Sequence, residues 1–393
     1  MRILLKYAVL LAVILASVSC ARVAVKQPVP SDKPMVRLAA AQYPQFSDDA
    51  SIESLKEAVN RNLKYLSALK EDHLFHYGDD TYTPREIKAS LLYFMSVLHT
   101  CKGDVQMLNK SMREDFTVYA ASGSDGLGKV YYTGYYVPVL DGSRTKTGRY
   151  RYPLYSLPKD LFSVDADSGK SVGRRVEGKV VPYYTHEEIH KGALAGRGLE
   201  FLWVDNRVDL FFLQVQGSGT VRLEDGSMIN VTYAGANGRS YKPAGRVLVD
   251  ENKIPLSEMS LKAIKRYLSD HPEDVDRVLF SNPSYVFFRE SRESAIGSTG
   301  VSLIDGRAIA TDKKVFPQGA LVYVSTNKSE FREDESLIGQ SQLTRFALNQ
   351  DTGGAIIGPG RADFFWGRGS AAELQAGYMK YNGTLYFIVK KRK

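Results

Sequence analysis

The hydrophobic pattern of the chain changes near residue 114, and this change limits the folds that it can adopt. Before it, apolar residues recur at helical spacing from Ser51 onward. The segment 83–86 begins with Thr and Pro and ends with Glu, which is typical of a helix start, and a shorter helix is expected over 104–112. After residue 114, short β-branched and aromatic runs alternate with Gly and Pro turns. The sequence therefore predicts a mainly β fold with N-terminal helices.

The β-rich part is long enough to divide into two domains. A tyrosine-rich strand ends at Pro138, where we place a domain crossing, and Asn282-Pro283 returns the chain to the first domain. Between them lie many short predicted strands and one amphipathic helix. The boundaries that we expect are 51–137 for the helices and first strands of a barrel, 138–288 for an inserted β-domain, and 289–393 for the remaining barrel strands.

The N-terminus predicts the compartment. Arg2 and Lys6 precede an apolar run over 7–16 that is too short for an ordinary transmembrane helix, and small residues then lead to Cys20. Residues 1–20 thus read as a lipoprotein-type signal peptide with Cys20 as the acylated residue. Ser17 stands where Leu is usual, so ordinary cleavage after a small residue stays open.

Residues 21–50 contain four prolines and no clear periodicity, which predicts a tether. With Cys20 acylated, Cys101 is the one remaining cysteine of the two in the sequence. We expect it to be a small buried residue and predict no disulfide framework.

The charge indicates an anionic partner only weakly. The formal net charge is +8, and Lys and Arg are scattered until the last four residues. Zinc-finger spacing, basic heptads and ribonucleoprotein motifs are absent from the sequence, so nucleic acid is not predicted. The positive net charge is equally compatible with an anionic polymer such as bacterial cell wall.

The candidate chemistry lies between Asp351 and Gly367. Asp351 opens a Gly-rich turn, whereas Asp363 lies in an apolar run that predicts a buried strand. A buried carboxylate either pairs with a cation or takes a raised pKa and stays protonated. A protonated carboxyl is what the general acid of glycosidic cleavage requires, and Phe365 and Trp366 are available to stack on sugars. The alternative is a structural Asp that caps a turn.

Polar side chains in the inserted region are candidates for sugar binding. Gln214 and Gln216 alternate with apolar residues, so both amides are predicted on one face of a strand that ends at 217–219. Asn237-Gly238 forms a second candidate loop. Either stretch also fits a simple hairpin end.

Two stretches match protease motifs but lack the context that a protease needs. His186 and His190 have the zinc-protease spacing, but Thr185 and Glu188 form a capping box, Gly192 ends the helix early, and no third ligand is evident. The Asp-Thr-Gly triplet at 351–353 matches aspartic proteases, which need two carboxylates that share a proton, yet it occurs once. No metal and no cofactor are predicted.

A third carboxylate, Asp312, lies between a short strand and a Pro317/Gly319 turn. Together with Asp351 and Asp363 it resembles the three-aspartate domain of the membrane-bound lytic murein transglycosylase A family. The resemblance runs from about residue 131 to the C-terminus and includes the segments 132–136, 211–219, 233–238 and 282–288. It implies a double-psi β-barrel assembled from two chain segments, an inserted second β-domain, and a saccharide groove between them.

The resemblance also implies the reaction. These enzymes cleave the β-1,4 bond between N-acetylmuramic acid and N-acetylglucosamine without water, because the muramyl 6-hydroxyl attacks C1 and leaves a 1,6-anhydro product. One carboxyl can therefore protonate the leaving oxygen and then accept the proton of that hydroxyl. Asp363 is the expected acid and base, Asp351 orients its strand or adjusts the field at Asp363, and Asp312 is structural. Thr133 is implied to face the groove, although an ordinary edge strand would also explain it.

The implied partners are peptidoglycan glycan strands and other cell-wall enzymes, with membrane contact only through the lipid on Cys20. Ala21, rather than Asp, follows Cys20, so the resemblance implies an outer-membrane lipoprotein facing the periplasm. One departure from the family pattern is Ile357, where related sequences often carry Lys.

Two other functions stay open. In an inverting hydrolase, Asp351 or Asp312 would activate water. A module that binds wall glycans without cutting them is the non-enzymatic option. A buried, protonated Asp363 open to the groove would favour an enzyme, and a solvated Asp363 paired with Arg361 would favour a binding module.

Overall fold

A computed structural model describes residues 31–392 apart from 167, 168 and 294. The predicted signal peptide, Cys20 and the first part of the predicted tether lie outside the described residues. Within them, no helix combines the length and the apolar character needed to cross a membrane.

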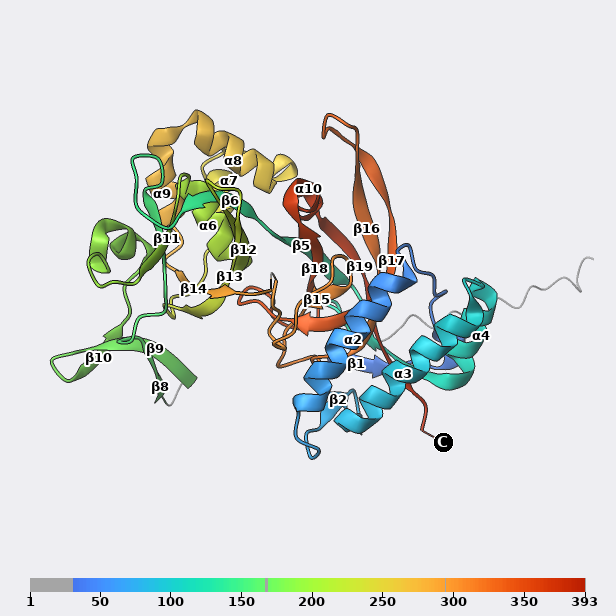
Figure 1. Ribbon diagram of the computed structural model, residues 1–393. Helices are drawn as coiled ribbons and strands as arrows, with labels where there is room; N and C mark the ends of the chain where they lie inside the picture. Colours follow the sequence, from blue (N-terminus) through green and yellow to red (C-terminus); the bar gives the residue numbers. More distant parts are fainter. Residues whose placement is uncertain (1–30, 167–168, 294, 393) are drawn as a thin grey trace, which may run out of the picture. The chain divides into compact units, whose positions relative to one another are not determined.

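Three N-terminal helices form as predicted (Figure 1). Ser51 caps α2 (Ile52–Ala68), Thr83 and Glu86 form the capping box of α3 (Pro84–Cys101), and Asp104 caps α4 (Val105–Asp115). Helices α2 and α3 pack against each other and against strands of the barrel. Cys101 is buried at the end of α3, as expected.

A closed ring of six strands forms the barrel. The order is β19-β16-β17-β15-β18-β5, and β19 also pairs with β5. The ring joins one strand from before the inserted region to five strands from after it, which confirms the predicted assembly from two chain segments. The strands are β5 (Val130–Val137), β15 (Ala308–Ala310), β16 (Leu321–Phe331), β17 (Leu337–Asp351), β18 (Arg361–Arg368) and β19 (Lys380–Lys390).

Three further pieces adjoin the ring. Strand β4 (Phe116–Ala121) pairs with β19, the hairpin β2 (Phe75–Tyr77) and β3 (Asp80–Tyr82) joins α2 to α3, and α10 (Gly369–Tyr378) packs on β5 and β18.

The expected tether is wrong for residues 35–48. Strand β1 (Met35–Arg37) pairs with β4, and a short turn η1 (Ala40–Gln42) follows it. Phe46 is 0% exposed, and Asp48 forms a 2.7 Å ion pair with the fully buried Arg307. Individual side chains and the pairing of β1 with β4 hold this segment in place. Its sequence therefore shows no hydrophobic periodicity.

The region between β5 and β15 contains a second sheet, of order β14-β13-β12-β6-β11-β7, and a separate antiparallel sheet of order β10-β9-β8. The strands are β6 (Val139–Ser143), β7 (Tyr152–Tyr155), β8 (Phe162–Ala166), β9 (Gly169–Val176), β10 (Lys179–Pro182), β11 (Glu200–Val204), β12 (Ser218–Leu223), β13 (Met228–Ala236) and β14 (Val286–Ser291).

The same region contains more helix than predicted (Figure 1). The amphipathic helix that we expected is α8. The helices are α5 (His186–Glu188), α6 (Arg207–Gln216), α7 (Ala244–Asp250), α8 (Leu261–Asp270) and α9 (Val275–Phe280), with short turns η2 (Ile189–Ala193), η3 (Leu256–Glu258) and η4 (Pro272–Asp274).

The strand predicted for Gln214 and Gln216 is wrong, because both lie in α6. The side chain of Asn206 caps the first turn, and Gly217 ends the helix in the left-handed conformation at φ 78°. The alternation of amide and apolar residues at 213–216 imitates a strand, whereas the two caps are the signals that identify the helix.

Candidate active site

One row of paired residues crosses five barrel strands and carries the predicted chemistry. Ala310 of β15 pairs with Asp351 of β17 on one side and with Asp363 of β18 on the other. Asp363 pairs with Thr133 of β5, which in turn pairs with Lys380 of β19. Directly paired residues share a face of a sheet. Asp363, Thr133 and Lys380 therefore project from the same side of the barrel wall.

Asp363 is half-buried and hydrogen-bonded. Its Oδ1 accepts a short hydrogen bond from the Thr133 hydroxyl and lies 3.3 Å from Nη2 of Arg361. Its side chain is 22% exposed. Burial raises the pKa of Asp363, whereas the Thr133 hydrogen bond and the Arg361 charge lower it. The net direction is upward, so burial outweighs both partners.

Asp363 thus combines two features that were expected as alternatives. The raised pKa is the feature expected of an enzyme, and the Arg361 pair is the feature expected of a binding module. Because the carboxyl is neither fully solvated nor neutralised, it can hold a proton and also be stabilised after losing it.

Arg361 is held from three directions. Its Nη2 donates to Thr133 Oγ1 at 3.0 Å as well as approaching Asp363, and its guanidinium lies 5.1 Å from the centre of the Tyr131 ring. Tyr131 is 37% exposed. An aromatic face with this exposure beside the carboxyl is suited to contact a sugar ring.

Asp351 is the second carboxylate of the row. Its Oδ1 accepts hydrogen bonds from the backbone N–H of Thr352 at 2.8 Å and of Ser298 at 3.0 Å. These contacts have the orienting form predicted for it. Burial raises the pKa of Asp351 to about 6, and the Asp363 charge acts in the same direction. Burial and both carboxylates also raise the pKa of Tyr135, whose side chain lies near each of them.

Asp312 has contacts of a structural kind. One oxygen accepts from the backbone N–H of Lys314 at 3.0 Å, and the other accepts from that of Gly358 at 2.9 Å. The carboxylate thereby ties the turn after β15 to the loop before β18. This arrangement supports the position of Asp363 from outside the row.

Two predicted sugar contacts are wrong. Phe365 is 1% exposed and packs 5.1 Å from the Tyr135 ring, so neither face is free. Asn237 is 0% exposed, and its amide bonds the backbone of Tyr184, Pro283, Tyr285 and Arg239. Both residues serve packing instead.

Trp366 and Gln216 are engaged within the protein, whereas the buried Oε1 of Gln214 has no hydrogen-bond partner among the described residues. The indole N–H of Trp366 donates to the sulfur of Met379 at 3.2 Å. Gln216 accepts a 3.1 Å hydrogen bond from the backbone N–H of Tyr136 in β5, and Gln214 is 7% exposed. Gln216 therefore links α6 to the strand that carries Thr133.

Arg361 was expected beside Asp363 only as the partner of a solvated carboxylate, and it lies two positions before Asp363 on the same strand. Tyr241 and Lys380 near Asp363 were not predicted from the sequence. Tyr241 comes from the inserted region: burial raises its pKa to about 12, and the Asp363 charge contributes. No local sequence pattern identifies Lys380, because this residue comes to lie beside Thr133 only when β19 pairs with β5 and closes the ring.

The histidine motif has the local structure that the sequence predicted. Thr185 and Glu188 form the capping box, and Gly192 has a φ of 103°. His186 is 6% exposed and packs on Phe211, and burial lowers its pKa to about 4. The described residues contain no group of three or more His, Cys, Asp or Glu arranged to hold a metal.

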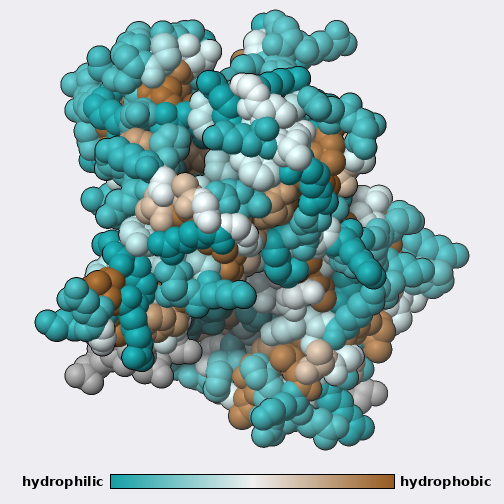
Figure 2. Space-filling view, turned by 60° about the vertical axis from the view of Figure 1, so that its left-hand side comes forward, coloured by the Kyte–Doolittle hydropathy of each residue, from teal (hydrophilic) through white to brown (hydrophobic). Residues whose placement is uncertain are grey.

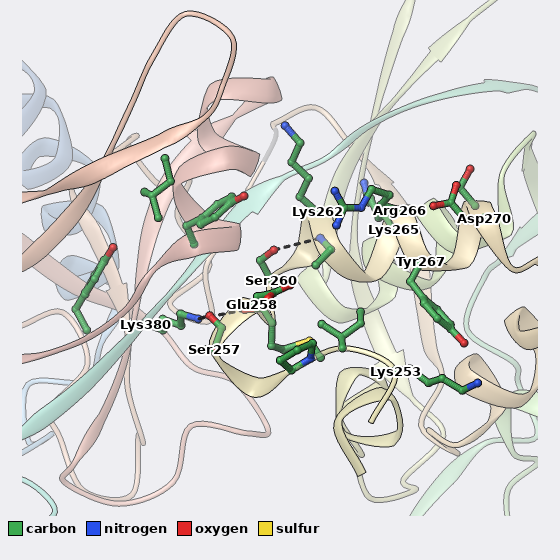
Figure 3. A pocket seen from close by; sticks show the side chains of 18 residues that line it. Lys253, Ser257, Glu258, Ser260, Lys262, Lys265, Arg266, Tyr267, Asp270 and Lys380 are labelled. Atoms are coloured by element: carbon green, nitrogen blue, oxygen red, sulfur yellow. Dashed lines mark hydrogen bonds between the residues drawn. The ribbon is translucent and has the colours of Figure 1, made fainter. Parts of the chain in front are cut away.

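A cavity of about 920 Å³ adjoins the Lys380 end of the row (Figure 3). Nζ of Lys380 donates to the backbone oxygens of Ser257 at 3.0 Å and Met259 at 3.4 Å. On the face seen in Figure 2, hydrophobic residues form small separate patches in a mainly hydrophilic surface.

Two family descriptions match the sequence. The MltA specific insert domain matches residues 131–289, and the 3D domain matches residues 307–389. The sequence is 33% identical over 276 residues to membrane-bound lytic murein transglycosylase A of Vibrio cholerae, covering 69% of each chain. It is 31% identical over 287 residues to the protein of the same name from Escherichia coli K12, covering 71% of each.

Solved structures agree with these matches. The crystal structure of membrane-bound lytic murein transglycosylase from Agrobacterium tumefaciens has a TM-score of 0.72 and 28% identity, over 91% of this chain and 97% of that one. The structure of E. coli MltA with bound chitohexaose has a TM-score of 0.71 over 93% and 96% of the two chains. Its identity of 23% supports the fold alone.

Proposed function

Because the chain belongs to the membrane-bound lytic murein transglycosylase A family, and is therefore a lytic murein transglycosylase that acts on peptidoglycan, we propose that Asp363 is its single acid and base. The observation that supports this role is the half-buried carboxyl with a raised pKa, held between Thr133 and Arg361.

In the first step, protonated Asp363 gives its proton to the glycosidic oxygen, and the bond between that oxygen and C1 of the muramyl sugar breaks. Burial keeps the proton available at higher pH than for a solvated Asp. As the proton leaves, the new carboxylate gains the Thr133 hydrogen bond and the Arg361 charge. These two partners stabilise the state that forms during the reaction.

In the second step, the same carboxylate accepts the proton of the muramyl 6-hydroxyl while that oxygen bonds to C1. A 1,6-anhydro ring closes, water is not consumed, and Asp363 returns to its protonated form. One carboxyl suffices because the nucleophile belongs to the substrate. Asp351 adjusts the field at Asp363 across one intervening strand.

The same family membership supports a place in the cell envelope. We further propose that Cys20 is acylated, that the protein is an outer-membrane lipoprotein facing the periplasm, and that other cell-wall enzymes are its partners. The motif at 17–20 supports the lipid anchor. Radiolabelled fatty acid incorporated by the wild type and lost in Cys20→Ala would test it.

An inverting hydrolase is the second candidate, and one observation favours it. Asp351 and Asp363 lie in one row with a single strand between them, so their strands are about 10 Å apart. The quantity that bears on inversion is the distance between the two carboxyl groups, which inverting glycosidases keep at roughly 6.5–9.5 Å with a water between them, and not the distance between the strands.

Mass spectrometry of the sugars released from purified peptidoglycan separates these candidates. The form that starts at residue 21 contains the whole compact unit of residues 31–393. We expect anhydromuramyl ends from the wild type and no release by Asp363→Asn. Reducing ends that carry one added water would establish a hydrolase and direct attention to Asp351. Cleavage retained in Asp363→Asn would refute its role, and no release by either protein would indicate a binding module.

A further inference from the structure

The cavity beside Lys380 lies between two parts of the chain (Figure 3). One wall consists of η3, α8 and the residues just before them. The other wall contains Tyr378, at the end of α10, and Lys380 and Tyr381 of β19. The bonds from Lys380 to the backbone of Ser257 and Met259 join the walls at one point.

The cavity lining contains more cationic than acidic side chains. Five cationic side chains face two acidic ones: Lys253, Lys262, Lys265, Arg266 and Lys380 against Glu258 and Asp270. Two cations are already paired with acids outside the lining, since Lys262 lies 2.8 Å from Glu335, and Lys265 bridges Asp209 and Glu373. Among the residues that the structure describes, no ion pair involves Lys253 or Arg266. Arg266 and Lys253 are therefore not fixed by an ion pair, although Lys253 lies close enough to Asp274 to help lower the pKa of that carboxyl.

The cavity is close to the proposed acid and base. Lys380 pairs with Thr133, and Thr133 pairs with Asp363, so Lys380 is two strand spacings from Asp363, about 10 Å. All three residues project from one face of the barrel wall. A substituent on a sugar bound at Asp363 can reach the cavity along this face.

The sugar units of the glycan do not require charged side chains for binding. N-acetylglucosamine is uncharged, and hydroxyl and acetamido groups are served by neutral donors and acceptors. The charges of a murein strand are on the peptide stem attached to the lactyl group of the muramyl sugar. A stem carries carboxylates and, where it contains a diamino acid, a free amine. Lys253 and Arg266 match the carboxylates, while Glu258 and Asp270 match the amine.

We propose that this cavity binds the peptide stem of a muramyl residue next to the cleavage point, so that the protein prefers stem-bearing glycan to bare glycan. The proposal rests on the function proposed for Asp363, because that function places the muramyl sugar at the row. Lys380 positions the two walls, whereas Lys253 and Arg266 contact the stem.

Binding to an uncleaved substrate tests the proposal most directly. The Asp363→Asn protein is compared with Asp363→Asn that also carries Lys253→Gln and Arg266→Gln. Each is titrated with murein oligosaccharides that retain their stems and with the same oligosaccharides stripped by an amidase. We expect Kd for the stem-bearing ligand to rise roughly tenfold or more, because charge-assisted hydrogen bonds are lost. Kd for the stripped ligand should change less than about twofold.

Lys110→Gln is the matched control, because Lys110 is exposed on α4 and does not line the cavity. It should leave both Kd values unchanged. Lys253→Arg with Arg266→Lys should restore most of the preference for stem-bearing ligand, which a merely misfolded variant would not do. Equal losses on both ligands, or no loss on either, would overturn the proposal.

A different experimental result would contradict the function proposed for Asp363. If Asp363→Asn still cleaves, or the wild type leaves hydrolysed ends, the acid and base assignment is wrong. The contrast between the two ligands is measured without cleavage and is read independently of that outcome.

Discussion

Thr133 lies directly opposite Asp363 in the parallel pairing of β5 with β18, and its hydroxyl donates a hydrogen bond to Oδ1 of that carboxylate. The same hydroxyl accepts a 3.0 Å hydrogen bond from Arg361. A donor that faces a carboxylate favours its ionised form, so Thr133 opposes the effect of burial at Asp363.

Thr133→Val should therefore raise the pKa of Asp363 further, because it removes the donor and keeps the shape. The acid must be protonated at the start of the reaction, so we expect the alkaline limb of the kcat/KM profile to move up by about one pH unit, the effect of one lost hydrogen bond. Cleavage assays across pH measure the limb. Thr100→Val, on the exposed side of α3, is the control, and an unmoved limb would contradict the role of Thr133.

Arg361→Gln should move the alkaline limb in the same direction, because the Arg361 charge also lowers the pKa of Asp363. It should lower the maximal rate as well, since the carboxylate formed in the first step loses its cation. Arg361→Lys keeps the charge without the guanidinium fork, and we expect an intermediate result. Arg85→Gln, exposed on α3, serves as control. A limb that moves toward lower pH would show that Arg361 acts in another way.

Asp351→Asn should change how stability depends on pH. The folded-state pKa of Asp351 is raised to about 6 from an ordinary value of 3.8, so between these values the folded state holds a proton that the unfolded state gives up. This contribution to stability is present at low pH and is lost as pH rises through 6. The variant lacks it, so its stability relative to the wild type should increase by on the order of 2 kcal/mol from pH 4 to pH 7.

Urea unfolding at several pH values measures this difference. A constant difference between Asp351→Asn and the wild type over that range would mean that Asp351 titrates normally.

Arg307→Ala should destabilise the fold strongly. Arg307 is 0% exposed and donates to Asp48, to Ser54, and to the backbone oxygens of Ser51 and Phe346. Removing one partner of such a buried pair typically costs about 3–5 kcal/mol. The exposed pair Lys33–Asp79 provides the comparison, and Lys33→Ala should cost less than about 1 kcal/mol. Similar losses in urea unfolding would show that the N-terminal segment is held in another way.

The sequence predicted well where local chemistry was decisive. The three helix starts have side-chain caps, and Asp363 stood out as a carboxylate in an apolar strand. Both kinds of signal lie within a few residues. The contacts of Asp351 and Asp312 with backbone N–H groups also follow from the glycine-rich loops around them.

Prediction failed where distant pairing decides the outcome. Thr133 and Asp363 are 230 residues apart in sequence, so their contact comes only from the register of β5 and β18. Lys380 joins them through closure of the ring. Asn237 looked available because Asn-Gly forms turns, yet four backbone groups satisfy its amide. Sequence alone cannot show whether a polar side chain faces solvent or the protein backbone.

Strand β19 completes the barrel by pairing with β5, and the ribosome makes it after every other strand of the ring. Until it emerges, Lys380 cannot join the row beside Thr133, and β5 lacks one of its two neighbours. An unfinished chain therefore lacks the closed wall on which the row is built. Closure of the barrel and completion of the row are therefore one event in folding.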